Sequence, residues 1–295
     1  MLDLQKLRYF VEVARHRHFS KAAEVCHVAQ PSLSQQIKKL EESAGGSLLV
    51  RNRRAISLTP LGESLLRHAQ NILSEVDRAE NFLLEAQGRA RRTIRLGAIP
   101  TIAPYLLPRL VEHLRHLLPE AEFALEENRT EALVENLLAG SMDYALLSPP
   151  TAADEFCEAF DLPGDPLYLT LPTNHPLAKQ KTIAPPELAG ENILLLERSH
   201  CLHGQTAAYC EQIGLNTSIN IQGSQIETLI RLVEQGLGLT FTPGLAVSTY
   251  TDRKVVFRPL TDPPCQRKIQ LVWPRSPISP SVHEWILTAA RGLEA

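Results

Sequence analysis

The chain has 295 residues, of which 44% are hydrophobic, so it holds enough apolar material for two or three cores and is predicted to be a multidomain protein. Its first residues lack a basic stretch followed by an apolar one, and no run of about 18 apolar residues occurs. We therefore expect a cytoplasmic protein with no membrane partner. Five cysteines in a reducing compartment are expected to be thiols at rest, and their odd number argues against a structural disulfide framework.

Charge is distributed unevenly along the chain. The formal net charge is −3, which alone would argue against a nucleic-acid partner. Residues 1–60, however, carry ten basic and five acidic residues, a formal charge of +5. The remainder carries 20 basic and 28 acidic residues, a formal charge of −8. The two parts therefore face different partners, and the N-terminal part is the candidate for binding phosphate groups.

The N-terminal part shows the pattern of three short helices. Apolar side chains recur at helical spacing over 4–14, and a second short helix is predicted over 20–25. Pro31 opens a third helix at its first position, where a missing amide hydrogen costs nothing. The outer face of this helix carries hydroxyl and amide side chains, which predicts a helix-turn-helix that reads bases in the major groove of double-stranded DNA. The expected DNA contacts are Gln30, Pro31, Ser32, Ser34, Gln35 and Lys38.

A basic hairpin is predicted directly behind the helix-turn-helix. The apolar runs 48–50 and 56–58 flank a cluster of arginines, a pattern suited to a two-stranded wing whose tip contacts phosphates. A solvated charged hairpin is the alternative, but the position behind a helix-turn-helix favours the wing. The expected phosphate contacts are Arg51, Arg53 and Arg54.

A long helix follows, capped by Thr59-Pro60 and running to about Gln87. Its apolar residues alternate in steps of four and three, which is a short heptad seam. The seam either packs on its own domain or pairs with a second copy of the chain, and the absence of nearby strands favours a dimer. Residues 88–92 are expected to form a hinge. The seam consists of Leu65, Ala69, Ile72, Val76, Ala79 and Leu83.

Strand-like and helical runs alternate in the rest of the chain, which predicts a parallel-sheet α/β architecture in two lobes with a cleft between them. The first lobe is expected to contain strands at 94–99, 122–125 and 144–147 and helices at 106–117, 131–139 and 280–293. The second is expected to contain strands at 167–171, 193–196 and 239–242 and a helix at 226–235.

The chain is therefore predicted to contain three domains, and its fold class is mixed, with all-α and α/β parts. An all-α winged helix-turn-helix domain is expected over 1–59, a linker and dimerisation helix with its hinge over 60–92, and a two-lobed α/β regulatory domain over 93–295. The boundaries of lobe one are about 93–163 and 268–295, and those of lobe two about 164–267.

The spacing between Cys201 and Cys210 is the most informative chemical feature of the second lobe. If the stretch after Gly204 is helical, nine residues hold the two Cα atoms about 13 Å apart. A disulfide needs them within about 7 Å. Either the two thiols never bond, or their bonding unwinds the helix and forces a rearrangement that the rest of the protein can sense.

Along its whole length the sequence resembles the LysR-type transcriptional regulators, and within that family the sensors of hydrogen peroxide. The family resemblance rests on Phe19-Ser20-Lys21-Ala22-Ala23, on residues 28–37, on Lys39-Leu40-Glu41, and on Gly236-Leu237-Gly238 with Pro243. The resemblance to peroxide sensors rests on Ile99-Pro100-Thr101, on residues 104–108, on His200-Cys201-Leu202, and on Cys210 after the same gap.

This resemblance implies a periplasmic-binding-protein-like regulatory domain and a redox role for the two cysteines. Cys201 would be the peroxidatic thiol, oxidised to sulfenic acid, and Cys210 the resolving thiol that converts it to a disulfide. The residues expected to bind peroxide or activate the thiol are Thr101, Thr130, His200 and Arg267. The implied partners are DNA, RNA polymerase, further copies of the chain in a homodimer or homotetramer, and a thioredoxin- or glutaredoxin-type reductant. No cofactor, metal or enzymatic turnover is expected.

Each of these residues also has an ordinary structural interpretation. Thr101 can cap a helix, His200 can orient backbone, and Cys210 on an Ala-rich helix can be a buried small hydrophobic residue. Cys26 is expected in the core of the helix-turn-helix, while Cys157 and Cys265 have no predicted partner, and a position of either near Cys201 would cast doubt on the two-cysteine scheme.

Three other functions compete with a peroxide-sensing regulator. The first is a LysR-type regulator whose cleft binds a small organic anion. The second is a thiol peroxidase or oxidoreductase, which a lone C-x8-C motif attached to a DNA reader disfavours. The third is a two-lobed solute-binding protein, which would have no use for residues 1–60 and for which we expect an export signal.

Overall fold

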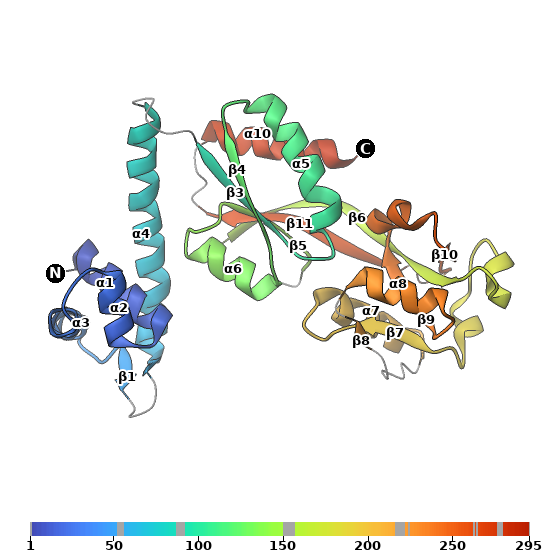
Figure 1. Ribbon diagram of the computed structural model, residues 1–295, viewed down its shortest axis with the longest axis horizontal. Coiled ribbons are helices and arrows are strands. Elements are labelled where there is room, and N and C mark those ends of the chain that lie inside the picture. The colour runs from blue at the N-terminus through green and yellow to red at the C-terminus, as the bar shows by residue number, and fades with distance from the viewer. Residues whose placement is uncertain are drawn as a thin grey trace. The chain divides into compact units, whose positions relative to one another are not determined.

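The computed structural model describes residues 2–51, 56–86, 92–149, 157–215, 222–223, 225–261, 263, 265–275 and 280–294. The chain forms two compact units, one built mainly from residues 1–92 and the other mainly from the residues that follow. Figure 1 shows the elements of each unit. None of the helices within the described ranges is long and apolar enough to cross a membrane.

The first unit is a helix-turn-helix with a two-stranded antiparallel hairpin and a long helix. Its core is lined by Phe10 and Val13 from the first helix and Leu33, Ile37 and Leu40 from the third, all fully buried. Leu33, Ile37 and Leu40 therefore form the inward face of the third helix. The elements are α1 (Leu4–His16), α2 (Phe19–Val25), α3 (Gln30–Ala44), β1 (Leu49–Arg51), β2 (Ile56–Leu58) and α4 (Pro60–Ala86).

Local signals set the ends of these helices. The Asp3 carboxylate accepts a hydrogen bond from the Lys6 amide at 2.9 Å and caps α1. Gly45 ends α3 with a positive φ of 70°, a left-handed conformation that favours glycine. The Thr59 hydroxyl accepts from the Gly62 amide at 3.0 Å, so the predicted cap of the long helix is confirmed. α3 begins at Gln30, so Pro31 is its second residue rather than its first.

The second unit is built on one nine-stranded sheet with the order β4-β3-β5-β11-β6-β9-β7-β8, and β10 pairs with β6. Its first lobe carries α5 and α10, which pack on each other (Figure 1). The elements at this end are β3 (Thr93–Ala98), α5 (Ala103–Leu117), β4 (Glu122–Glu127), α6 (Thr130–Leu138), β5 (Tyr144–Leu147) and α10 (Pro280–Arg291).

The second lobe has its own hydrophobic core beneath α7 and α8. Its strands β7 and β9 pair in parallel, and every residue of both is buried, as expected of parallel strands covered by helices. The elements are β7 (Ile193–Leu196), α7 (Cys201–Gln212), β8 (Gln222–Gly223), α8 (Ile226–Glu234), β9 (Leu239–Pro243), α9 (Gly244–Val247) and β10 (Val255–Pro259), with the short 3₁₀ helices η1 (Pro176–Lys179), η2 (Pro185–Leu188), η3 (Ser248–Tyr250) and η4 (Gly292–Glu294).

Two long strands join the lobes: β6 (Cys157–Pro172) and β11 (Gln266–Pro274). They pair with each other in antiparallel fashion, and each also pairs antiparallel with a strand of one lobe, β11 with β5 and β6 with β9. The expected parallel sheet is therefore a mixed one. The parallel pairs lie on either side of this central antiparallel pair, which the alternation of strands and helices in sequence did not predict.

Candidate functional site

Cys201 is the first residue of α7, directly after β7 and a short turn. His200 precedes the helix in an extended conformation, and the Cys201 side chain is half-buried. A thiol at this position faces the unpaired amide groups of the first helical turn, which stabilise negative charge. The backbone N–H groups of Cys201 and Leu202 accordingly lower the pKa of the Cys201 thiol.

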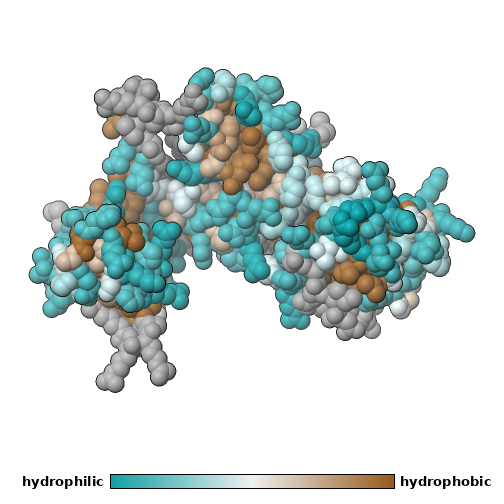
Figure 2. Space-filling model, viewed as in Figure 1, coloured by the Kyte–Doolittle hydropathy of each residue, from teal (hydrophilic) through white to brown (hydrophobic). Residues whose placement is uncertain are grey.

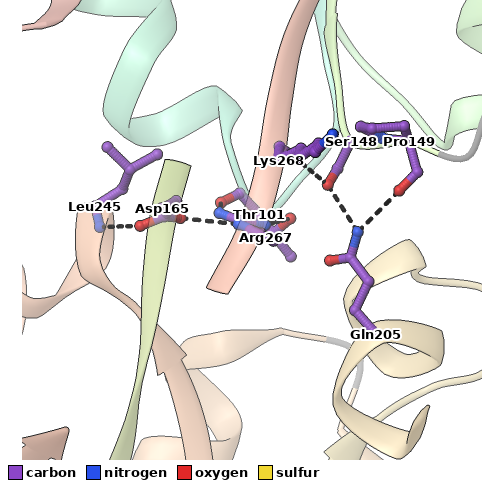
Figure 3. Close-up of polar contacts among 8 residues, drawn as sticks. All are labelled: Thr101, Ser148, Pro149, Asp165, Gln205, Leu245, Arg267 and Lys268. Carbon is purple, nitrogen blue, oxygen red and sulfur yellow. Dashed lines mark hydrogen bonds and ion pairs between the residues drawn. The ribbon is translucent and has the colours of Figure 1, made fainter. Parts of the chain in front are cut away.

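Arg267 is the buried cation of this site, and three hydrogen bonds fix its guanidinium (Figure 3). Its Nε donates to Oδ2 of Asp165 at 2.8 Å. Its Nη1 donates to Oγ1 of Thr101 at 2.8 Å, and its Nη2 donates to the Thr101 carbonyl oxygen at 2.9 Å. The other Asp165 oxygen accepts from the Leu245 amide at 3.0 Å. This network joins Thr101 of the first lobe to both connecting strands and to α9.

Burial and charge act in opposite directions on Cys201. Burial has the largest effect and raises the pKa of its thiol above the ordinary value. The Arg267 guanidinium lowers that pKa, and the Glu131 carboxylate raises it. Arg267 is therefore close enough to stabilise the Cys201 thiolate, but the resting group is predominantly a thiol at neutral pH.

Gln205 lies one helical turn after Cys201 and reaches across to the first lobe. Its Nε2 donates to Ser148 Oγ at 2.9 Å and to the Pro149 carbonyl oxygen at 3.1 Å, as Figure 3 shows. Ser148 in turn donates to the Lys268 carbonyl oxygen at 2.6 Å. The Gln205 Oε1 atom is buried and has no hydrogen-bond partner among the residues described. A small donor molecule could satisfy this acceptor.

The structure brings together part of the expected peroxide site. Thr101 and Arg267 are in direct contact, and both are buried. Thr130 is the first residue of α6, and the charge of its neighbour Glu131 raises the pKa of the Cys201 thiol, so Glu131 lies within electrostatic range of the cysteine. His200 stands at the start of α7, half-buried.

Cys210 lies on the same helix as Cys201 and is fully buried. Because α7 is helical from Cys201 to Gln212, nine helical steps separate the Cα atoms by about 13 Å. Both residues are free thiols. The helical geometry considered from the sequence is confirmed, so a disulfide between them requires α7 to unwind.

The three remaining cysteines occupy different environments. Cys26 is half-buried at the end of α2 and packs against the core of the first unit, close to its expected place. Cys157 is buried at the start of β6. Cys265 is buried in the hydrophobic core of the second lobe, which also contains Cys210.

Most of the predicted DNA-reading residues of α3 are exposed. All the predicted contacts on α3 are exposed except Ser34, which is half-buried. The backbone of Arg51 ends β1, and Arg53 and Arg54 lie outside the described residues. The exposed set is Gln30, Pro31, Ser32, Gln35 and Lys38.

The predicted seam on α4 divides into two parts. Leu65 and Ala69 pack in the core of their own domain, so for these two the intradomain alternative holds. Ile72 and Leu83 are exposed, with 41% and 56% of their surface accessible. Val76 is half-buried and Ala79 is exposed. Figure 2 shows apolar surface on α4.

Two residues of the site escape sequence reasoning. Gln205 carries a usable signal, because it follows Cys201 by four positions and therefore shares its helical face. Asp165 carries none, since it lies 102 positions from Arg267 in a stretch rich in proline and glycine. Within the described residues, no cluster of three or more potential metal ligands is found.

Comparison with known proteins places the chain in a family. Residues 4–63 match the bacterial regulatory helix-turn-helix model of the lysR family, and residues 87–293 match the LysR substrate binding domain. A hydrogen peroxide-inducible genes activator from Pectobacterium carotovorum subsp. carotovorum is 36% identical over 279 residues, covering 94% of this chain and 92% of that protein.

Solved structures extend the similarity to the fold. A full-length OxyR variant from Pseudomonas aeruginosa superposes with a TM-score of 0.77 and 30% identity, covering 99% of this chain and 95% of that one. An OxyR mutant from Corynebacterium glutamicum with H2O2 bound has a TM-score of 0.65 and 30% identity, covering 98% of this chain and 92% of that one. The chain therefore belongs to the LysR family of transcriptional regulators and is similar to OxyR proteins over nearly its whole length.

Proposed function

We propose that this protein is a DNA-binding transcriptional regulator that senses hydrogen peroxide through reversible oxidation of Cys201 and controls antioxidant genes. The observation that carries the proposal is that Cys201 and Cys210 begin and nearly end a single helix, with the first thiol within electrostatic range of the buried Arg267. Oxidation of such a pair changes the conformation of the helix as well as the chemistry of the thiol.

The chemistry proceeds in two balanced steps. The Cys201 thiolate attacks one peroxide oxygen, the O–O bond breaks, and the departing hydroxide takes a proton to become water. The resulting sulfenic acid then condenses with the Cys210 thiol, and a disulfide forms with loss of a second water. Arg267 supports the first step by stabilising the thiolate. The Thr101 hydroxyl and the unpaired Gln205 Oε1 supply a donor and an acceptor for positioning peroxide.

The path from this site to the rest of the protein runs through α7. Disulfide formation unwinds the helix and displaces Gln205, whose two hydrogen bonds tie the second lobe to Ser148 and Pro149 of the first. The two lobes then lose a direct polar contact beside the connecting strands. In a homodimer or homotetramer paired through the exposed part of α4, the loss of this contact alters the spacing of the helix-turn-helix motifs that bind DNA.

The remaining partners follow from the same proposal. A transcriptional activator works on double-stranded DNA and contacts RNA polymerase, so its place of action is the cytoplasm. A thioredoxin- or glutaredoxin-type protein returns the disulfide to two thiols by exchange. The similarity to a hydrogen peroxide-inducible genes activator supports this assignment.

The decisive experiment is mass spectrometry after brief treatment of the reduced full-length protein with one equivalent of hydrogen peroxide. Trypsin leaves Cys201 and Cys210 on one peptide, residues 199–231, so their disulfide appears as the loss of two hydrogens. We expect this peptide to be oxidised within seconds, before Cys26, Cys157 and Cys265. Cys201→Ser should abolish the reaction, and Cys210→Ser should leave a trapped sulfenic acid. Equal, slow oxidation of all five thiols would overturn the proposal in favour of a regulator that binds a small organic anion.

A further inference from the structure

Cys265 shares a buried environment with Cys210 in the core of the second lobe. Both belong to the same hydrophobic cluster, and their accessible surfaces are 7% and 0%. Cys265 lies just before β11, one residue from its first residue, Gln266. Its carbonyl oxygen accepts from the Leu167 amide at 2.8 Å, which fixes the backbone of this segment on β6.

Tyr209 holds the end of α7 against the same segment. Its hydroxyl donates to the Pro263 carbonyl oxygen at 2.7 Å, two residues before Cys265, and its ring packs edge-on against Phe241. Cys210 follows Tyr209 in the helix. The two thiols are close enough to interact electrostatically. Burial has the largest effect on the pKa of the Cys265 thiol and the charge of the Cys210 thiolate the second largest, and together they raise this pKa to about 12.

We propose that Cys265 is a second disulfide partner of Cys210 and that this bond blocks the peroxide switch. The blocking role rests on the proposed function, in which Cys210 resolves the sulfenic acid of Cys201. A Cys210–Cys265 bond joins two segments that are already packed together, so α7 stays folded. Cys210 is then held in the core and cannot reach Cys201, which leaves the protein in its resting conformation.

The bond forms by the same overall chemistry as the switch, with hydrogen peroxide as oxidant. The Cys210 thiolate attacks a peroxide oxygen and becomes a sulfenic acid, while the departing hydroxide is protonated to water. The Cys265 thiol then condenses with that sulfenic acid and a second water is lost. Two thiols and one peroxide thus give one disulfide and two waters.

This second reaction is slower than the switch. Burial raises the pKa of the Cys210 thiol to about 11. At neutral pH only about one molecule in ten thousand then carries the thiolate at this position. Cys201, by contrast, has Arg267 and two backbone amides that favour its thiolate. The Cys210–Cys265 bond is therefore a product of sustained oxidation rather than of a brief signal.

The pairing is tested in full-length Cys201→Ser protein, which lacks the first partner. The protein is incubated with excess hydrogen peroxide at pH 9, its free thiols are trapped, and it is digested with trypsin. A Cys210–Cys265 bond cross-links two separate peptides, residues 199–231 and 255–267. We expect this cross-link to be the principal disulfide product. The proposal is overturned if Cys210 remains unbonded, or if it pairs as often with Cys157, an equally buried thiol outside this cluster.

The blocking role is tested by comparing the native chain with Cys265→Ala, using Cys157→Ala as the matched control. A Cys201–Cys210 bond can also be converted by exchange, because the Cys265 thiolate attacks the Cys210 sulfur and Cys201 leaves as a thiolate. After prolonged peroxide exposure, Cys265→Ala should therefore yield about twice as much Cys201–Cys210 peptide as the native chain, if the two bonds are equally stable. Cys157→Ala should behave like the native chain. Equal yields in all three would overturn the blocking role. Failure of the Cys201–Cys210 bond in every variant would instead overturn the proposed function and leave the pairing test unaffected.

Discussion

Arg267 owes its position to partners on two different segments, and Thr101 provides two of its three hydrogen bonds. A buried guanidinium that loses a partner keeps its desolvation cost, so single substitutions at the partners of Arg267 are expected to lower the free energy of unfolding. The carbonyl oxygen of Thr101 accepts regardless of side chain, whereas Oγ1 depends on the hydroxyl. The two contributions of this residue can therefore be separated by mutation.

We predict that Thr101→Val lowers the free energy of unfolding by about 1.5–3 kcal/mol, the usual value for a hydrogen bond to a charged group. Valine matches threonine in shape but leaves Arg267 Nη1 without its acceptor. Thr101→Ser retains the hydroxyl and serves as the control, with a much smaller loss. Urea denaturation of both variants measures the difference. Equal loss in valine and serine variants would show that packing of the methyl group dominates instead.

The reactivity of Cys201 should rise with pH. Burial raises the pKa of its thiol above the ordinary value, so the reactive thiolate is the minor form at neutral pH and increases through the alkaline range. Arg267→Gln removes a cation that lowers this pKa, so its profile should move further to alkaline pH. The rate of Cys201 alkylation by iodoacetamide, followed by peptide mass spectrometry from pH 6 to 10, gives both profiles. A profile with its midpoint at acidic pH would contradict the assigned balance of burial and charge.

At the scale of elements, α7 is the part that changes shape in the proposed switch, and Gly204 would make that change easier. It lies in the helix interior, and a Cβ at this position would meet nothing within 4 Å. Gly204→Ala should therefore stabilise the helix by about 0.5–1 kcal/mol without a steric clash. The redox equilibrium should shift two- to fivefold toward the two thiols, roughly as that free energy implies.

The matched control for Gly204→Ala is Ala208→Gly, an exposed position between the same two cysteines. It should weaken α7 by a similar amount and favour the disulfide. Equilibration of each variant with a series of dithiothreitol ratios measures the shift. If both substitutions left the equilibrium unchanged, unwinding of α7 would not be part of disulfide formation.

The sheet shows how far local patterns predict this fold. The strands expected at 144–147 and 193–196 coincide with β5 and β7, because an apolar run buried on both faces leaves a clear signal. The sequence predicts only 167–171 of the much longer β6, since Pro163 and Pro166 interrupt the strand pattern before that point. β10 and β11 were not predicted, and their pairing with β6 joins residues far apart in sequence.

The candidate site likewise contains some residues that the sequence predicts and others that it does not. Cys201 and Cys210 are visible as a spacing, and their helical arrangement follows from composition. The role expected of Arg267 comes from family resemblance, because its flanking residues carry no local signal. Asp165, which fixes the guanidinium, and Cys265, which shares the core with Cys210, become apparent only when distant segments are packed together. Tertiary contacts of this kind leave no periodicity in one sequence.

At the scale of the whole molecule, the uneven distribution of charge along the chain indicates different functions for its two units. The basic residues concentrate in the first unit, and those of α3 flank side chains able to read bases. Lys38 and Gln35 are both exposed on this helix, one suited to a phosphate and the other to a base edge. Their replacement should consequently weaken DNA binding in two distinguishable ways.

We predict that Lys38→Ala weakens binding to all DNA sequences alike and reduces the magnitude of the log–log salt slope by about 0.9, the value for one lost phosphate contact. Gln35→Ala should leave that slope unchanged and relax the preference for one base pair, at a cost of about 1–3 kcal/mol for the specific site. Fluorescence anisotropy titrations on specific and random duplexes, from 50 to 300 mM salt, measure both quantities. The predictions concern the reduced protein, so dithiothreitol is kept in every titration. A flat salt response of the native chain would remove the first unit as the DNA reader, whereas a slope change in Gln35→Ala alone would exchange the roles of the two residues.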